Sequence, residues 1–196
     1  MFTLLALIVS YLIGSIPFGF MLAKLKGLDI REYGSGNIGA TNVWRNLGPL
    51  SGLAVLLLDM GKGVAAVLLG RSLGGAETEL LAGLAVLSGH SWSVFLRFKG
   101  GKMIATGAGV VLAISPVLML VALLVWLTTV AVSRYVSLGS MLAAASVPVT
   151  MAFLKLSVWH IAFGTAIAAL AVYKHRSNIV RILNGTEFKV MKGGGK

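Results

Sequence analysis

Long apolar runs, separated by short polar segments, dominate this chain and limit what it can fold into. A helix that crosses a membrane needs about 20 largely apolar residues, and Met1 to Ala23 already meets this length. Hydrophobic residues make up 57% of the chain and charged residues only 12%, which is too apolar for the surface of a soluble domain. The sequence therefore predicts an all-α, polytopic integral membrane helical bundle.

The basic residues predict the orientation of this bundle. Lysine and arginine gather in blocks between the apolar runs, as they do in cytoplasmic loops. Lys24, Lys26 and Arg31 follow the first run, so we expect the N-terminus outside and the next polar segment inside. The predicted spans lie within Met1 to Ala23, Pro49 to Leu69, Leu80 to Leu96, Met103 to Ser133, Leu138 to Leu154 and Val158 to Tyr173.

The segment Met103 to Ser133 decides the number of crossings. Ser115 and Pro116 interrupt it, so one long tilted helix, two short helices and a re-entrant element are all open. The C-terminal tail is basic and belongs inside, which requires an odd number of crossings from an outside N-terminus. We therefore predict seven transmembrane helices with a turn near Ser115 and Pro116. They form one domain over residues 1–192, followed by a flexible tail, 193–196.

Charge and cysteine content exclude several classes of function. The formal net charge of +11 is explained by topology and by attraction to anionic lipid and anionic substrates, so no nucleic-acid partner is expected. The chain has no cysteine, which excludes disulfides, zinc–thiolate sites and cysteine nucleophiles. We expect no metal and no cofactor.

The first polar segment, after the first apolar run, reads GSGNIGATNVWRNLG from Gly34 to Gly48 and predicts phosphate binding. Its glycines are expected to turn through positive φ and expose N–H groups. Short polar side chains add donors, and an arginine can hold two phosphate oxygens. The segment matches neither the Rossmann nor the Walker pattern, and a flexible loop is the alternative. The candidate residues are Gly34, Ser35, Gly36, Asn37, Gly39, Thr41, Asn42 and Arg45.

The second polar segment reads GHSWSVFLRFKGGK from Gly89 to Lys102. Gly100 and Gly101 precede Lys102, whose ammonium is expected at the N-terminus of the next helix, where an anion is favoured. The alternative is a basic anchor at a helix start. His90 is as compatible with a hydrogen bond between packed helices as with catalysis.

The third polar segment, Lys174 to Lys189, reads KHRSNIVRILNGTEFK and is predicted on the same cytoplasmic face as the other two. His175, beside Arg176 and Asn178, is a functional candidate, with interfacial anchoring as the alternative. Glu187 is the only acid in the tail, and we expect it to tie the tail to a basic loop instead of doing chemistry.

Two charges within a predicted span form a further anomaly. Asp59 and Lys62 are three residues apart and can pair on one helix face. Charges inside a membrane are costly and usually face a site or cavity, although a structural ion pair between helices is equally compatible with the spacing. Gly61 and Gly63 beside them are expected to permit close approach of a neighbouring helix.

Together the three polar segments resemble the signatures of the bacterial acyl-phosphate-dependent glycerol-3-phosphate acyltransferases, the PlsY family. Their order, spacing and predicted side all agree with that family. The resemblance implies transfer of a fatty acyl group from acyl phosphate to the 1-hydroxyl of glycerol 3-phosphate, giving lysophosphatidic acid and inorganic phosphate. It also implies that the protein lies in the bacterial cytoplasmic membrane. The partners that it implies are membrane lipid and the soluble enzyme that makes acyl phosphate.

The resemblance also implies roles for single residues. Ser35 and Arg45 fall in an activity-critical motif, Gly100, Gly101 and Lys102 in a glycerol 3-phosphate-binding motif, and His175 and Asn178 in an active-site motif. Glu187 falls at a position that matters more for integrity.

The mechanism and a rival function both stay open at this point. Because acyl phosphate is already activated, the protein need mainly supply proximity and charge stabilisation. We expect the donor phosphate to help remove the proton from the attacking hydroxyl, with His175 or His90 positioning it. The rival is a small transporter of phosphorylated or anionic solutes, which would be favoured by inverted repeats, and none is evident.

Overall fold

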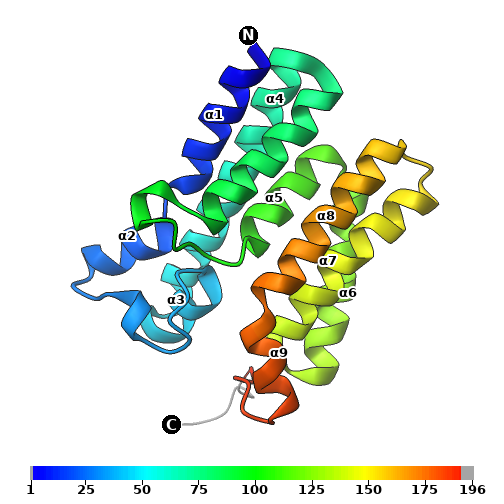
Figure 1. Cartoon of the computed structure of the whole chain (residues 1–196). Helices are drawn as coiled ribbons and strands as arrows, with labels where there is room; N and C mark the ends of the chain where they lie inside the picture. Colours follow the sequence, from blue (N-terminus) through cyan, green and yellow to red (C-terminus); the bar gives the residue numbers. More distant parts are fainter. Residues whose placement is uncertain (1, 191–196) are drawn as a thin grey trace. The chain divides into compact units, whose positions relative to one another are not determined.

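The computed structural model describes residues 2–190, which are helical with irregular connections and contain no β-strand (Figure 1). This confirms the predicted all-α class. The chain divides into two compact units, Met1–Ile114 and Ser115–Lys196, hereafter the first and second units. The single domain over residues 1–192 stays a prediction, and the predicted tail, 193–196, lies outside the described residues.

The first unit begins with two helices in place of one continuous span. α1 (Phe2–Ser15) ends before Pro17, and α2 (Phe18–Leu25) begins directly after it. Proline lacks an N–H group and disfavours helical geometry in the residue before it, which explains the break. Together the two helices are long and apolar enough to cross a membrane.

The long helix α4 (Pro49–Ser91) is a hairpin of two arms, which packs against α1. Gly74 and Gly75 leave helical geometry, and Gly75 has a φ of 73°, which favours glycine. Arg71 bonds Glu79 across the turn, with Nε 2.7 Å from Oε2. Figure 1 shows the chain reversing there, in teal. The connection between the spans predicted to end at Leu69 and to begin at Leu80 is therefore a tight turn, and the second arm ends at Ser91, not at Leu96 as predicted.

Glycines allow close crossings of α4 with α1 and with α5 (Ile104–Ile114). A Cβ on Gly63 would overlap the carbonyl oxygen of Thr106, and one on Gly109 would overlap that of Met60. Gly14 and Gly89 make equivalent contacts between α1 and the second arm of α4. A Cβ on Gly61 would meet nothing within 4 Å, so the expectation that this glycine contacts a neighbour is wrong.

A small apolar core supports the first polar segment. It contains residues from α2, α3 (Ala40–Leu47) and the first arm of α4, as well as from the two 3₁₀ turns Ile30–Glu32 and Val94–Leu96. The first and second polar segments therefore share one core. Its buried members are Ala23, Ile30, Ile38, Val43, Val55 and Leu96.

The second unit contains α6 (Pro116–Ser133), α7 (Val136–Phe153), α8 (Val158–Lys174) and the short α9 (Arg176–Leu183). α6 packs on α7, and α7 packs on α8. The predicted break at Ser115 and Pro116 is confirmed, since α5 ends at Ile114 and α6 begins at Pro116. Seven crossings stay a prediction.

Candidate functional site

Asn42, the buried centre of the first polar segment, holds its loop together. Its Nδ2 lies 2.9 Å from the carbonyl oxygen of Asn37, 3.0 Å from that of Tyr33 and 3.3 Å from that of Ile30. Its Oδ1 accepts from the backbone N–H of Ser35 at 3.0 Å. An amide has two N–H donors and one acceptor oxygen, so the loop itself uses the hydrogen-bonding capacity of this side chain.

The glycines of this loop differ in their roles. Gly34 and Gly36 have φ values of 58° and 68°, as predicted. Gly39 has a φ of −76° and a ψ of 164°, so the expected positive φ is wrong there. Gly39 precedes α3, where extended backbone is the ordinary N-cap geometry. The loop thus turns twice and then begins a helix.

The loop presents several predicted ligand residues at its surface. Thr41 and Arg45 are exposed on α3, and Ser35 and Asn37 are half-buried. Before the loop, Asp29 pairs with Arg31 at 2.7 Å and with Lys24 at 3.2 Å. Hydrogen bonding from Arg31 is the main cause that lowers the pKa of Asp29 below its ordinary value, so this carboxylate stays charged and fixes the turn after α2.

Asp59 and Lys62 form a buried ion pair within the first unit, with Nζ 2.7 Å from Oδ1. The Lys62 ammonium lies 2.8 Å from His90 Nδ1 and donates to the carbonyl oxygen of Ile16 at 3.1 Å. Thr106 Oγ1 lies 3.2 Å from the same His90 nitrogen. The first arm of α4, its second arm, α5 and the break between α1 and α2 therefore meet at one polar cluster, made of Asp59, Lys62, His90 and Thr106.

The Gly100–Gly101 turn packs on His90. The N–H of Gly101 donates to the carbonyl oxygen of His90 at 3.0 Å. A Cβ on Gly101 would overlap His90 Nε2, and one on Gly100 would overlap the His90 carbonyl oxygen. Lys102 follows, two residues before α5 begins at Ile104, and the placement of its ammonium at the helix N-terminus stays a prediction.

The backbone around this turn is strained. Arg97, Phe98 and Met103 have φ values of 52°, 61° and 59°, which residues with side chains rarely adopt. Hydrogen bonds hold the segment, including one from the N–H of Phe98 to the carbonyl oxygen of Ser93 at 2.8 Å. Strain of this kind persists where surrounding structure fixes it, and it is common at functional sites.

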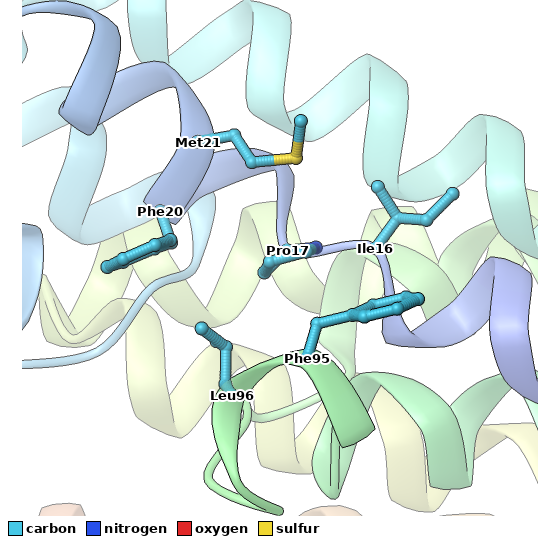
Figure 2. A pocket seen from close by; sticks show the side chains of 6 residues that line it. All are labelled: Ile16, Pro17, Phe20, Met21, Phe95 and Leu96. Carbon is cyan, nitrogen blue, oxygen red and sulfur yellow. The ribbon is translucent and has the colours of Figure 1, made fainter.

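An apolar pocket of about 380 Å³ opens beside the break between α1 and α2. Figure 2 shows the lining side chains, which come from this break, from α2 and from the Val94–Leu96 turn. The carbonyl oxygen of Ile16, a pocket residue, accepts from Lys62, so the pocket adjoins the polar cluster. Its lining is Ile16, Pro17, Phe20, Met21, Phe95 and Leu96.

In the second unit, His175 lies buried between α8 and α9. Its Nδ1 is 2.7 Å from the carbonyl oxygen of Ala171, which can only accept. In the neutral ring the proton is therefore on Nδ1, and the lone pair is on Nε2. Arg176 is exposed beside it, with its guanidinium 4.8 Å from the centre of the Tyr173 ring.

Glu187 joins the segment after α9 to α9 itself and to α7. Its Oε1 accepts from Asn178 Nδ2 at 2.7 Å and from Ser137 Oγ at 2.8 Å, and its Oε2 accepts from Arg181 Nε at 2.7 Å. Burial alone would raise the pKa of Glu187, but these hydrogen bonds outweigh it and lower the pKa below its ordinary value. The contacts fit the predicted structural role, and they orient Asn178.

Within each unit the structure brings predicted residues together and adds others. Gly34, Ser35, Asn37 and Asn42 share one loop, while Asn178 and Glu187 share a hydrogen bond. Thr106 and Ser137 were missed, because a hydroxyl side chain in an apolar helix gives no pattern that marks it. The expectation that all three polar segments share one membrane face stays a prediction.

Comparison with known proteins agrees with this geometry. A family model described as glycerol-3-phosphate acyltransferase matches residues 4–185. The glycerol-3-phosphate acyltransferase of Desulforamulus reducens is 58% identical over 190 residues, which cover 96% of this chain and 95% of the relative. The protein of the same name from Desulforudis audaxviator is 55% identical over 180 residues, which cover 91% of each chain.

Two solved structures are also similar. Both are crystal structures of PlsY (YgiH), described as an integral membrane glycerol 3-phosphate acyltransferase. The glycerol 3-phosphate form has a TM-score of 0.94 and 43% identity, with 96% of both chains covered. The lysophosphatidic acid form has a TM-score of 0.91 and 42% identity, with 96% of this chain and 95% of that one covered. With its polar loops, its apolar helices and a family match over nearly its whole length, this chain belongs to the glycerol-3-phosphate acyltransferase family of integral membrane proteins.

Proposed function

We propose that this chain transfers a fatty acyl group from acyl phosphate to the 1-hydroxyl of sn-glycerol 3-phosphate. The products are 1-acyl-glycerol 3-phosphate, which is lysophosphatidic acid, and inorganic phosphate. The observation that carries the proposal is the likeness to PlsY in its glycerol 3-phosphate form, at 43% identity and a TM-score of 0.94. The second similar structure, in the lysophosphatidic acid form, supports the product.

The chemistry suits a protein without cysteine. The 1-hydroxyl oxygen attacks the acyl carbon, a new ester bond forms, and the bond from that carbon to the phosphate oxygen breaks. The hydroxyl proton passes to a base, and phosphate leaves with the bonding electrons. Because phosphate is a good leaving group, positioning of two anionic reactants and stabilisation of charge supply most of the catalysis.

The exposed side chains of the first polar segment are suited to hold a phosphate. Arg45 can donate two parallel hydrogen bonds to phosphate oxygens, and Ser35 and Thr41 add hydroxyl groups near it in the sequence. We assign Asn42 to shaping this loop, because its amide is used within the loop. Gly100, Gly101 and Lys102 are proposed to bind glycerol 3-phosphate.

The two histidine candidates differ in what they can do. His175 donates through Nδ1 to a carbonyl oxygen, so its neutral ring can accept a proton or hydrogen bond at Nε2. His90 faces the donor Lys62 with its Nδ1, which places its proton on Nε2. We therefore propose that His175, together with the donor phosphate, handles the hydroxyl proton, and that His90 does not.

The apolar pocket has the chemistry that an acyl chain requires. Its volume of about 380 Å³ lies within the range of about 300–1,000 Å³ seen for small-molecule sites. We propose that the acyl chain of the donor enters it. Met21→Trp should then lower kcat/KM for long-chain donors more than for short-chain donors, and equal losses for both would contradict this placement.

The proposed setting is the bacterial cytoplasmic membrane, with the N-terminus outside, seven crossings and the active site facing the cytoplasm. Six apolar segments between Phe2 and Lys174 support it, and one of them is the two-armed α4. Acyl phosphate would come from a separate, soluble enzyme on the same side.

The proposal is tested with purified protein, acyl phosphate and glycerol 3-phosphate, by measuring lysophosphatidic acid and released phosphate. We expect turnover by the wild type and its loss in Arg45→Ala, with an unchanged elution profile in size-exclusion chromatography. Lys155→Ala is the matched control, because it removes an exposed cation outside the three polar segments. Absence of both products from the wild type would refute the proposed function.

A further inference from the structure

We propose that His90 is a positioning residue, which holds the Gly100–Gly101 turn in the shape that presents Lys102 to glycerol 3-phosphate. Asp59, Lys62 and Thr106 fix the orientation and tautomer of its ring. The inference rests on the proposed function, since it concerns the affinity of the same acyltransferase for its acceptor. It assigns a joint task to four residues of the polar cluster.

Lys62 is the centre of this arrangement. Its ammonium forms an ion pair with Asp59, with Nζ 2.7 Å from Oδ1, donates to the carbonyl oxygen of Ile16 at 3.1 Å and lies 2.8 Å from His90 Nδ1. These three partners belong to three different segments of the first unit. Lys62 thus links the first arm of α4, its second arm and the α1–α2 break.

The ring of His90 is oriented by these contacts. A lysine ammonium can only donate, so His90 Nδ1 is the acceptor, and the neutral ring carries its proton on Nε2. The Thr106 hydroxyl, 3.2 Å from the same nitrogen, approaches from α5. The lone pair of the ring is therefore engaged inside the cluster, which excludes His90 as the base that removes the substrate proton.

The opposite edge of the His90 ring, at Nε2, packs against the Gly100–Gly101 turn. Nε2 occupies the space where Gly101 would otherwise carry a Cβ, and the backbone of His90 binds the N–H of Gly101 at 3.0 Å. A displaced ring would leave the turn without this support. Because Arg97, Phe98 and Met103 already have strained positive φ values, the segment before α5 depends on such contacts to keep its shape.

The burial of the four cluster residues indicates that their task is to orient His90, and not mainly to stabilise the fold. Asp59, Lys62, His90 and Thr106 are all 5% exposed or less. A buried ion pair is weak support for stability, because desolvation offsets most of its attraction. Its two charges do, however, fix the direction of the contacts around them: Lys62 donates to the carbonyl oxygen of Ile16 and to His90 Nδ1, and the Thr106 hydroxyl faces the same ring nitrogen.

The test compares Thr106→Val, which removes the hydroxyl at nearly constant volume, with Thr106→Ser, which keeps it. Purified variants are assayed for kcat and for the KM of each substrate, and glycerol 3-phosphate affinity is measured by calorimetry without acyl phosphate. Loss of one oriented hydrogen bond should raise the KM and Kd for glycerol 3-phosphate in Thr106→Val by roughly five- to tenfold. kcat and the KM for acyl phosphate should stay within about threefold of wild type, and Thr106→Ser should recover most of the loss.

His90→Ala and His90→Asn extend the test to the ring. Alanine removes the whole imidazole ring, both Nδ1 that faces Lys62 and Nε2 that faces Gly101. We therefore expect a larger rise in the KM and Kd for glycerol 3-phosphate, on the order of tenfold or more. Asparagine keeps an acceptor for Lys62 but lacks the far edge of the ring, so it should recover folding without recovering affinity. If His90→Ala does not fold, the comparison of Thr106→Val with Thr106→Ser still tests the positioning role.

The outcomes are distinguishable from failure of the proposed function. A wild type that makes no lysophosphatidic acid would overturn the function itself. A working wild type with an unchanged Kd for glycerol 3-phosphate in Thr106→Val would overturn the positioning role. A loss of kcat on the order of 10⁴-fold in His90→Ala, with unchanged Kd, would also overturn it, because His90 would then act in the chemical step.

Discussion

Asn42 shows how a single amide can set the shape of a polar loop. Its Nδ2 faces three backbone carbonyl oxygens, while its Oδ1 receives an N–H group from Ser35. The loop spans the first polar segment and the 3₁₀ turn before it. The shape of the loop is therefore set by one side chain on α3, and the exposed residues around it are displayed by that shape.

Asn42→Asp should destabilise the protein, although the two side chains have nearly the same size and shape. A carboxylate keeps the acceptor for Ser35 but removes both donors and places charge against carbonyl oxygens, so we expect a loss of about 2 kcal/mol or more. Thermal unfolding in detergent measures it. Asn184→Asp, at an exposed position after α9, should change little. Equal stability of both variants would show that the Asn42 contacts do not matter for the loop.

Glu187 predicts a dependence of stability on pH. Its pKa in the folded protein lies below its ordinary value of 4.5, so folding favours the charged carboxylate. The stabilisation is complete above about pH 4.5 and is lost as the pH falls through the lower, folded pKa. The unfolding midpoint of wild type should therefore exceed that of Glu187→Gln at neutral pH, and the gap should shrink on acidification. Glu77→Gln, at an exposed position, is the control for the loss of one negative charge.

Most of the polar side chains at the candidate site could be predicted from the sequence, but the side chains that they contact could not. Asp59, Lys62 and His90 stand out in the sequence because charges and imidazoles are rare in apolar segments. His175 and Glu187 stand out within the third polar segment, as a histidine at the end of an apolar run and as the only acid of the tail. Thr106 and Ser137 do not, since hydroxyl groups occur in transmembrane helices without special roles. Which nitrogen of each histidine carries the proton also depends on partners far away in the sequence, such as Lys62 for His90.

At the scale of elements, the crossing of α4 and α5 depends on Gly63 and Gly109, each facing a carbonyl oxygen of the other helix. The sequence places Gly61 and Gly63 two positions apart, on different faces of the helix. A helix that is apolar all round carries no amphipathic signal to tell the protein-facing side from the lipid-facing side. This is why the role assigned to Gly61 was wrong.

Gly63→Ala and Gly61→Ala form a matched pair for this crossing. The new methyl group at position 63 would overlap the carbonyl oxygen of Thr106, so the helices must separate, and we expect a loss of about 1–3 kcal/mol. At position 61 the methyl group enters open space, so stability should be unchanged or slightly higher. Thermal unfolding in one detergent measures both. Similar behaviour of the two variants would contradict the crossing.

Helix breaks were predictable where proline or glycine dictates the backbone. Pro116 ended one helix and began another as predicted, because it disfavours helical geometry in Ser115. The end of α4 at Ser91 was not predictable in the same way. Val94, Phe95 and Leu96 continue the apolar run, yet they form a 3₁₀ turn that packs Leu96 into the core under the first polar segment.

For the whole molecule, the number of crossings is the main prediction that is still to be tested. The chain has no cysteine, so single cysteines can be introduced without a background. In the proposed seven-crossing topology, Ser72→Cys near the turn of α4 should react in intact cells with a membrane-impermeant maleimide. Asn184→Cys, after α9, should react only after permeabilisation. Reaction of both in intact cells would instead support six crossings.

The tight turn at Gly74 and Gly75 has a consequence for how the chain is inserted into a membrane. In the proposed topology the first arm of α4 carries Asp59 and Lys62, and a charged residue at mid-span costs about 2.5–3.5 kcal/mol during insertion. The second arm follows with no intervening loop and brings His90 toward those charges. The two arms are thus suited to leave the translocon together as a helical hairpin, and a nascent chain that ends before the second arm would hold its buried charges in lipid without that partner.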